Sequence, residues 1–471
     1  MSVALQRIAG VLALLSTALL IGTSALGPSA ASPSLGPGTG LPPYALGTHP
    51  SSGLVTVLLV VAYLAGGTAV ALGLWAVRQG AVVPRSWLVS AGCVAALAVL
   101  VPPLGSADHL SYAAYGRIAV QGGDPYVVRP VSWAGGHDPV TSAVEDPWTR
   151  TPSVYGPVAT GVQAITSLVG GDSLRRTVWL WQLVCLASWL AVGLLLRRRG
   201  GSRGAWLWLL NPVLLGLLLV GAHVDLLAAA LGRGALVLVP RRPLLAGVLL
   251  GAAVGVKLTF VLFAPAILYA LWRNRSGWRP ALLGVAGAAL VLVPSYLLVG
   301  SHAFDQLGEA RRFVSLATPW RLLVDAYGAR GLVLLLWPLV AVVLAVLLAR
   351  AVGRRPAGSD VTADAARATV VLGAAYVLAA PYSLPWYDAI AWAPLALVTT
   401  GLDALLLVRL AVLALAYVPG RVAGMSPRVH DLTLGYRREV APWLGIGLLL
   451  WLVWLARRVE TSRTGHSMPL G

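Results

Sequence analysis

The sequence predicts an all-α, polytopic membrane protein with about 12–14 transmembrane helices. Of its 471 residues, 58% are hydrophobic and 11% are charged, whereas a soluble domain carries about 25% charged residues. Apolar runs that are long enough, or almost long enough, to cross a hydrocarbon core of about 30 Å recur along the chain. Short arginine clusters separate these runs and fall mostly on one predicted side of the membrane.

The apolar runs give the expected helices in order. In the first half of the chain they are 8–26, 54–77, 87–104, 177–196, 204–220 and 226–239. They continue with 243–256, 258–272, 281–299, 330–350, 368–381, 389–400, 402–418 and 441–456. Several are shorter than the roughly 17 residues that a straight crossing needs, which leaves the helix count open by about two.

The charge pattern orients the chain and excludes a nucleic-acid binder. The 34 arginines and the single lysine, Lys257, give a formal net charge of +18. A nucleic-acid site would concentrate them on one face, but here they lie in short clusters, such as 197–203, between apolar runs. With the N-terminus inside, most clusters fall on the cytoplasmic side and most carboxylates on the other, as the positive-inside rule requires. We therefore expect a multi-pass protein of the plasma membrane with no nucleic-acid partner.

We expect a single transmembrane domain over 1–471, with a long external loop at 105–172 and a disordered cytoplasmic tail after 460. The first apolar run and the small residues near 25–31 also resemble a secretory signal peptide, although we favour an uncleaved helix. Cys93 and Cys185 lie inside apolar runs, which indicates core residues and not a disulfide or metal site.

The external loop 105–172 is the most informative segment, because long loops in compact proteins usually carry function. Its aromatic residues alternate with Asp, Arg and Gly; they are Tyr112, Tyr115, Tyr126, Trp133, Trp148 and Tyr155. Aromatic rings cover the apolar face of a pyranose while charged groups bond its hydroxyls, so this composition suits a sugar-binding site.

Asp108 opens this loop directly after an apolar run, at the start of the helical-looking segment DHLSYAAYGRIAV. Spacings of four and three place Asp108, Tyr112 and Tyr115 on one helix face. A carboxylate at the membrane–water boundary, backed by aromatic rings, can act as a general base on a hydroxyl. The alternative is that Asp108 only caps the N-terminus of the helix.

Asp124 and Tyr126 flank Pro125, and this triplet reads as a turn because a residue before proline is pushed out of the helical region. We count both among the candidate substrate-binding residues, although loop closure is a stronger alternative for Asp124 than helix capping is for Asp108.

Lys257 is the only lysine of the chain and lies in the apolar run AAVGVKLTFVLF. If 243–256 and 258–272 form a short hairpin, Lys257 lies at its outer tip. A buried ammonium costs at least about 3 kcal/mol in a membrane, so it needs a partner such as a lipid-linked phosphate. The alternative is a lysine that only snorkels to the interface; the phosphate would then be sought among Arg117, Arg311, Arg312 and Arg321.

His223 and Asp225, in GAHVD, lie at the predicted outer end of 204–220. Two residues apart, they do not share a helix face, but in a tight turn both could face a substrate. As a metal site this pair lacks a third ligand at fixed spacing, so we expect no metal and no cofactor. Asp388, in SLPWYDAI, is a further candidate on the outer face.

Three segments in order carry a resemblance to a known family: DHLSYAAYGRIAVQGGDPY, DPWTRTPSVYGP and LNPVLLGLLLVGAHVD. Over roughly residues 85–400 the chain resembles the polyprenol-phosphomannose-dependent α-1,6-mannosyltransferases of actinobacteria, which belong to the GT-C class of membrane glycosyltransferases. The resemblance implies a GT-C fold, an external active site and a sugar donor carried on polyprenyl phosphate. It also implies inversion at the anomeric carbon, with a base in an early external loop, and Asp108 is the position that matches.

The implied acceptor is a mannan or a lipid-linked glycan on the outer face of the plasma membrane. Two alternatives stay open. The same scaffold could use another lipid-phosphate sugar or a protein acceptor, or the chain could be a transporter or flippase. A transporter places ionisable groups near the midplane and shows repeated halves, whereas here the acidic groups gather outside and no repeat is evident.

Overall fold

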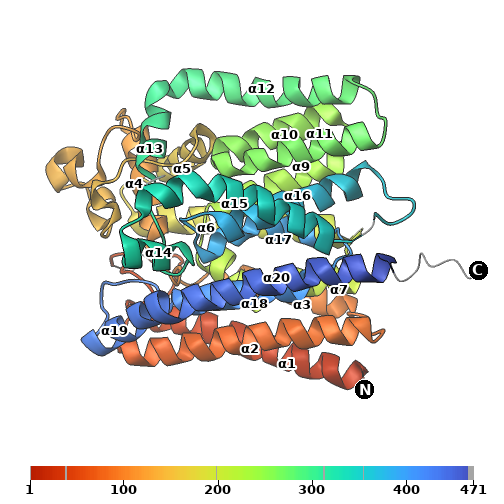
Figure 1. The fold of residues 1–471 in the computed structure, drawn as a ribbon. Helices are drawn as coiled ribbons and strands as arrows, with labels where there is room; N and C mark the ends of the chain where they lie inside the picture. Colours follow the sequence, from red (N-terminus) through yellow and green to blue (C-terminus); the bar gives the residue numbers. More distant parts are fainter. Residues whose placement is uncertain (1, 38–39, 198, 311–312, 354, 465–471) are drawn as a thin grey trace, which may run out of the picture.

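The computed structural model describes residues 2–37, 40–197, 199–310, 313–353 and 355–464. Within these ranges the chain is helical and contains no strand, so the expectation of an all-α membrane protein is confirmed. The long helices lie side by side with their axes roughly aligned across the molecule (Figure 1).

Eight stretches of the described residues are long and apolar enough to span a membrane. Five are single helices: α1 (Ser2–Leu26), α2 (Ser52–Arg78), α12 (Arg279–Val299), α15 (Arg330–Ala351) and α16 (Val361–Ala379). A sixth, Leu174–Leu196, lies within α6 (Leu174–Arg197). The seventh is the broken run Gly201–Val220, which holds α7 (Gly201–Leu207), α8 (Pro212–Leu214) and the π-helix η4 (Leu215–Val220). The eighth is the run Pro427–Val459, which holds α19 (Pro427–Gly435), the π-helix η8 (Tyr436–Val440) and most of α20 (Ala441–Thr464).

The other expected crossings are shorter helices, and the described residues therefore give fewer long spans than the expected count. They are α3 (Arg85–Ala98), α9 (Asp225–Leu238), α10 (Pro243–Val256), α11 (Phe263–Arg273), α17 (Ala389–Leu395) and α18 (Asp403–Ala416). Many residues of α9, α17 and α18 are buried. These helices are therefore covered by other helices, and length alone does not decide whether they cross.

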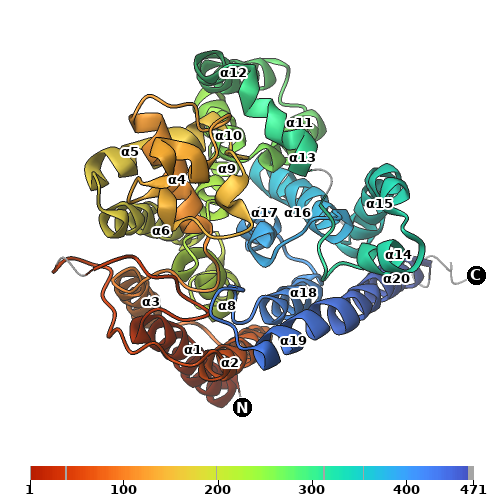
Figure 2. The same cartoon turned by 90° about the vertical axis from the view of Figure 1, so that its left-hand side faces the viewer.

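One end of the bundle carries most of the irregular structure. There, α4 (Asp108–Val120), the 3₁₀ turns η1 (Pro130–Gly136), η2 (Thr141–Ala143) and η3 (Trp148–Arg150), and α5 (Pro157–Gly170) replace the expected open loop. The same end holds η6 (Ser301–Phe304), α13 (Asp305–Ala310), α14 (Trp320–Tyr327) and α19 (Figure 1). We call it the loop end. It faces the viewer in Figure 2, with α4 and α5 in the foreground.

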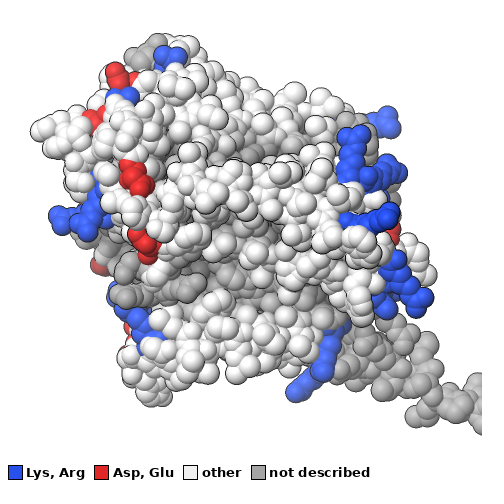
Figure 3. Space-filling model, turned by 90° about the horizontal axis from the view of Figure 1, so that it is seen from above, with Lys and Arg blue, Asp and Glu red and all other residues white. Residues whose placement is uncertain are grey.

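The opposite end carries short connections, the N-terminus and much of the arginine. Figure 3 shows lysine and arginine side chains gathered at that end, both acidic and basic side chains at the loop end, and a broad uncharged band between them. The arginines there include the last residue of α2, Arg78, and the first residues of α3 and α12, Arg85 and Arg279. An uncharged band between two charged ends is what a membrane-embedded bundle requires.

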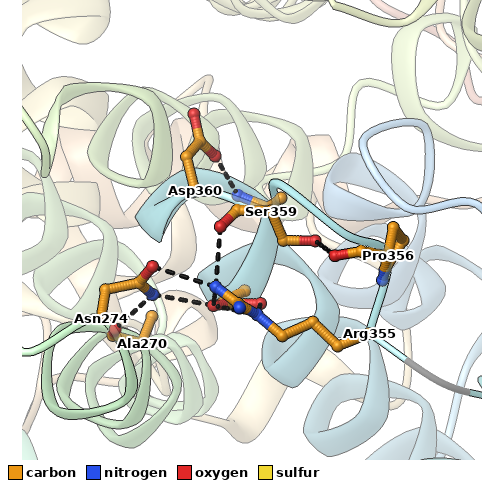
Figure 4. A network of polar contacts seen from close by, with 8 residues as sticks. Ala270, Asn274, Arg355, Pro356, Ser359 and Asp360 are labelled. Carbon is orange, nitrogen blue, oxygen red and sulfur yellow. Dashed lines mark hydrogen bonds and ion pairs between the residues drawn. The ribbon is translucent and has the colours of Figure 1, made fainter.

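A polar network closes the arginine-rich end (Figure 4). Arg355 donates to Asp364 at 2.7 Å, to the carbonyl of Ser359 at 2.7 Å and to Asn274 at 3.0 Å. Asn274 in turn donates to Asp364 at 2.7 Å. The network connects the residue after α11 with the segment before α16. Within it, the charges of Arg355 and Asp364 are paired with each other.

The described residues begin and end in a helix. α1 packs along α2, with the Ser16 hydroxyl donating to the Ala62 carbonyl at 2.7 Å. α20 extends to Thr464, so the tail expected to be disordered after 460 begins as helix, and residues 465–471 lie outside the described ranges.

Candidate functional site

Asp108 is the first residue of α4, and its carboxylate does not cap that helix. The position before it, Ala107, is the N-cap, and no side-chain capping bond forms there. The segment leading to Asp108 is pinned from both sides: the Leu104 amide donates to the Val220 carbonyl at 3.1 Å and the Gly105 amide to the Ala31 carbonyl at 2.8 Å. The backbone of Asp108 is therefore held in place, while its carboxylate, with 13% of the side chain exposed, makes no capping bond to the helix.

His223 meets Asp108 at the end of the broken run. Its Nε2 lies 3.7 Å from the Asp108 Oδ2 and 3.0 Å from the Ser106 hydroxyl. Its Nδ1 lies 2.5 Å from the Leu217 carbonyl, which belongs to the π-helical turn η4. π-helical turns occur often at functional sites, and this one ends at Val220, three residues before His223.

Asp225 and Lys257 form an ion pair beside these residues. The Lys257 Nζ lies 2.5 Å from the Asp225 Oδ1 and 3.5 Å from the centre of the Tyr387 ring. Asp225 is the first residue of α9, and Lys257 stands at the break between α10 and the 3₁₀ turn η5 (Leu258–Leu262). Lys257 keeps 14% of its side chain exposed and Asp225 2%. The lysine therefore has a protein partner and still reaches the site.

Aromatic rings wall the cluster. Trp386 stacks on His223 with ring centres 3.8 Å apart, and Tyr112 makes edge contacts with Tyr155 at 5.2 Å and Trp181 at 5.3 Å. Tyr115 points its hydroxyl to the Thr151 carbonyl at 2.9 Å. Tyr112, Tyr115, Trp181 and Trp386 are all buried, so these rings shield the charged centre from water.

Burial changes the proton affinity of both groups at the centre. Loss of water contact, followed by the negative charge of Asp225, raises the pKa of Asp108 to about 7, although the positive charge of Lys257 opposes this. Burial lowers the pKa of His223 to about 3. The histidine is therefore neutral at pH 7 while Asp108 exchanges its proton near that pH, which is the range in which a general base works best.

Four sequence candidates lie in structural contacts outside this cluster. Arg117 pairs with Asp138 at 2.8 Å and with Asp172, and so ties α4 to the loop. Asp124 accepts from the Tyr126 amide at 2.9 Å, in the expected turn, and contacts His302 at 3.1 Å. The Tyr126 hydroxyl bonds to Thr160 at 2.8 Å.

The fourth candidate, Asp388, is buried and pairs with Arg409 at 2.9 Å. Among the arginines considered as phosphate partners, Arg321 pairs with Asp325 at 2.7 Å, and Arg311 and Arg312 lie outside the described residues. The proposed site therefore does not include these residues.

Sequence reasoning missed Ser106, Trp386 and Tyr387, which contact the central residues directly. Trp386 and Tyr387 adjoin Asp388 in the η7 turn (Pro385–Asp388), so the sequence singled out this segment through Asp388 alone. Among the described residues, no three metal-ligating side chains come together, and the expectation that the reaction needs no metal stays a prediction.

Comparison with known proteins bears on this cluster. Residues 8–273, more than half of the chain, match a family model described as "Alpha-(1->6)-mannopyranosyltransferase, N-terminal domain". The matched part contains Asp108, His223, Asp225 and Lys257 but not the η7 turn.

Individual relatives give a consistent result. A protein of Mycobacterium tuberculosis named alpha-(1->6)-mannopyranosyltransferase A is 30% identical over 207 residues, which cover 41% of this chain and 39% of the relative. A probable alpha-(1->6)-mannopyranosyltransferase of Mycolicibacterium smegmatis is 30% identical over 236 residues, covering 47% of this chain and 38% of the relative. Alpha-(1->6)-mannopyranosyltransferase B of Corynebacterium glutamicum is 34% identical over 131 residues, covering 26% and 22%.

The chain spans about two fifths of the length of the first two of these relatives. No solved structure matches it.

Proposed function

Because this multi-pass membrane protein belongs to the alpha-(1->6)-mannopyranosyltransferase family, we propose that it transfers a mannosyl group to a mannan or lipid-linked glycan acceptor in α-1,6 linkage. The donor is polyprenyl-phosphate-mannose, and the anomeric carbon is inverted. The observation that carries the proposal is Asp108: a fixed carboxylate, free of any capping bond, whose pKa of about 7 suits a base.

In the proposed step Asp108 takes the proton of the acceptor hydroxyl while the hydroxyl oxygen attacks the anomeric carbon. The bond between that carbon and the phosphate oxygen breaks on the opposite face, and its electron pair leaves with the polyprenyl phosphate. One proton moves and one bond replaces another, so no further reactant is needed.

Lys257 is the proposed contact for the leaving phosphate. An ammonium has three N–H donors, and Asp225 takes one of them. A phosphate about 4 Å away gains roughly 4 kcal/mol at an effective dielectric of 20, before desolvation is subtracted. Leu258 and Val261, which follow the lysine, are 40% and 45% exposed, so apolar surface suited to a prenyl chain begins beside the charge.

The proposed reaction takes place on the outer face of the plasma membrane. The loop end holds Asp108, and the arginine-rich end lies opposite; by the positive-inside rule the arginine-rich end is cytoplasmic. This sidedness supports a lipid-linked donor, because a nucleotide sugar is made and kept in the cytoplasm while a prenyl chain stays in the membrane at either face.

The test is a transfer assay with purified protein in lipid. Radiolabelled polyprenyl-phosphate-mannose and an α-1,6-linked oligomannoside should give a product longer by one residue and sensitive to an α-1,6-mannosidase. GDP-mannose offered alone should give none. Transfer from GDP-mannose in the absence of any lipid donor would overturn the proposed donor, and transfer of glucose in place of mannose would favour the alternative sugar.

A further inference from the structure

His223 is held in one protonation pattern by the turn before it. A carbonyl oxygen only accepts hydrogen bonds, so the short contact between Nδ1 and the Leu217 carbonyl requires Nδ1 to carry the hydrogen. Leu217 lies in the π-helical turn η4, and the ring is pressed flat against Trp386. With the imidazole neutral and only 1% exposed, its Nε2 is an acceptor with one lone pair.

Two groups face that single acceptor. The Ser106 hydroxyl is at 3.0 Å and donates to it, since Nε2 has no hydrogen to give. The Asp108 Oδ2 is at 3.7 Å. An ionised carboxylate has no hydrogen to donate, so two lone pairs face each other there and no hydrogen bond forms. A protonated Asp108 could donate to Nε2 after a movement of less than 1 Å, judged from usual O–H···N lengths of about 2.8 Å.

We propose that His223 is a positioning residue for Asp108. Once the Asp108 carboxyl group has taken the proton of the sugar acceptor's hydroxyl, it donates a hydrogen bond to the His223 Nε2, and the Ser106 hydroxyl no longer donates to that nitrogen. This inference rests on the proposed function. The proton itself stays on Asp108, because the imidazole is too weak a base to keep it. The histidine thus favours the protonated carboxyl over the ionised one and strengthens Asp108 as a base during the transfer.

The other groups around Asp108 act differently: the negative charge of Asp225 also favours the protonated carboxyl, whereas the positive charge of Lys257 and a hydrogen bond from Trp148 favour the ionised one. The charged ones are Asp225 from α9 and Lys257 from the break after α10, which are paired with each other. The titratable phenols are Tyr112 and Tyr115 on α4 itself, Tyr155, Tyr382 and Tyr417. The pKa of each phenol is raised from its usual value by burial, so all of them stay neutral near pH 7. His223 therefore presents a neutral acceptor whose nitrogen lies close to the carboxylate oxygen.

The test compares pH–rate profiles at saturating donor and acceptor for wild type, His223→Leu, His223→Gln and Ser106→Ala. In His223→Leu the acid limb should move down by about one pH unit, and the plateau rate should fall by about tenfold, since the base is weaker. His223→Gln keeps an amide oxygen that can accept, so its midpoint should lie between wild type and His223→Leu. Ser106→Ala removes the competing donor, so its midpoint should move upward.

Opposite movement of the two midpoints is the signature that a packing defect would not produce. A packing defect would lower the rate equally at every pH and leave each midpoint in place. If His223→Gln and Ser106→Ala both fold, shown by a wild-type melting temperature, and both keep the wild-type midpoint, the inference is wrong. Failure of the proposed function looks different: wild type would then transfer no mannose from the polyprenyl-phosphate donor, or Asp108→Asn would keep wild-type turnover. Failure of this inference alone leaves wild type active and Asp108→Asn inactive.

Discussion

Because Asp225 and Lys257 form an ion pair, a substitution of either residue alone also changes the surroundings of the other. Asp225 is almost fully buried, and its Oδ2 has no hydrogen-bond partner. Removing the lysine alone would leave an unpaired buried carboxylate, and breaking a buried pair costs about 3–5 kcal/mol. A loss of activity in such a variant would not distinguish phosphate binding from damage to the fold.

The informative comparison is therefore made in an Asp225→Asn background. Adding Lys257→Met to that background removes the ammonium but leaves no unpaired charge, and we expect the donor's Kd to rise by about tenfold or more while the acceptor's KM changes little. Lys257→Arg should retain part of the affinity, because its charge remains with a different geometry. Equal donor binding by Asp225→Asn and the double variant, measured by titration in nanodiscs, would reduce Lys257 to an anchoring role.

Asp108 also predicts a dependence of stability on pH. Its pKa is about 7 in the folded protein, against about 4 for an exposed aspartate. The folded state then binds the proton more tightly than the unfolded state, so this group's stabilising contribution is complete below about pH 4 and is lost as the pH rises toward 7.

Asp108→Asn, which carries no charge to bury, should escape that loss. Its melting temperature in detergent should exceed that of wild type by a few degrees at pH 8, and the difference should shrink at pH 5. A constant difference across this range would show that the carboxylate is well solvated in the folded protein.

At this scale the sequence located the charged centre but not its neighbours. Asp108, His223, Asp225 and Lys257 stood out because each is a polar residue next to an apolar run. Ser106, Trp386 and Tyr387 did not, since serines and interfacial aromatic residues are common in membrane proteins and only the fold brings these three to the cluster. Arg117 and Asp388 also stood out as charged residues, but the sequence does not reveal that they pair with Asp138 and Arg409.

At the scale of elements, α12 depends on glycines for its contact with α10. Apart from Gly287, no described residue of α12 is buried. A Cβ at Gly287 would lie 2.1 Å from the Leu244 carbonyl oxygen, which no real packing allows. A Cβ at Gly284, three residues earlier on the same helix, would meet its nearest atom, the Pro243 carbonyl oxygen, at 3.9 Å.

Gly287→Ala should therefore destabilise the protein by about 1–3 kcal/mol, the usual cost of overpacking, while Gly284→Ala serves as the matched control and should be tolerated. Thermal unfolding in detergent measures both. Equal melting temperatures for the two variants would mean that α12 shifts away from α10 without cost.

Helices were predicted well where an apolar run was uninterrupted, as in α1, α2, α12 and α15. The prediction was weaker where the chain breaks near the site. The run expected as one helix at 204–220 is divided around Asn211, whose side chain caps α8 by accepting from the Val213 and Leu214 amides at 3.1 Å. Periodicity does not reveal such breaks, because the side chains on both sides of them remain apolar.

At the scale of the whole molecule, the proposed outer-face site rests on the difference in charge between the two ends. Ser132, in η1 at the loop end, is exposed, and Gln79, just after α2, is exposed at the arginine-rich end. Cys93 is exposed on the surface of the bundle, so it must be replaced by alanine before labelling.

In that background, a cysteine introduced by Ser132→Cys should react with an impermeant maleimide in intact cells, because the loop end is expected to face outward. One introduced by Gln79→Cys should react only after lysis. The reverse pattern would invert the topology and overturn the proposed outer-face site.

The single-turnover rate of Asp108→Asn tests the central claim most directly. Purified enzyme in nanodiscs would be saturated with polyprenyl-phosphate-mannose and mixed with acceptor, beside Asp124→Asn as a control that changes a turn aspartate of the same loop. Asparagine keeps the size of the side chain and loses its basicity, so transfer by Asp108→Asn should fall by about a hundredfold or more while donor binding is retained. Asp124→Asn should stay near the wild-type rate. Wild-type transfer by Asp108→Asn would contradict the account, since the carboxylate on which the site is built would then play no part in the chemistry.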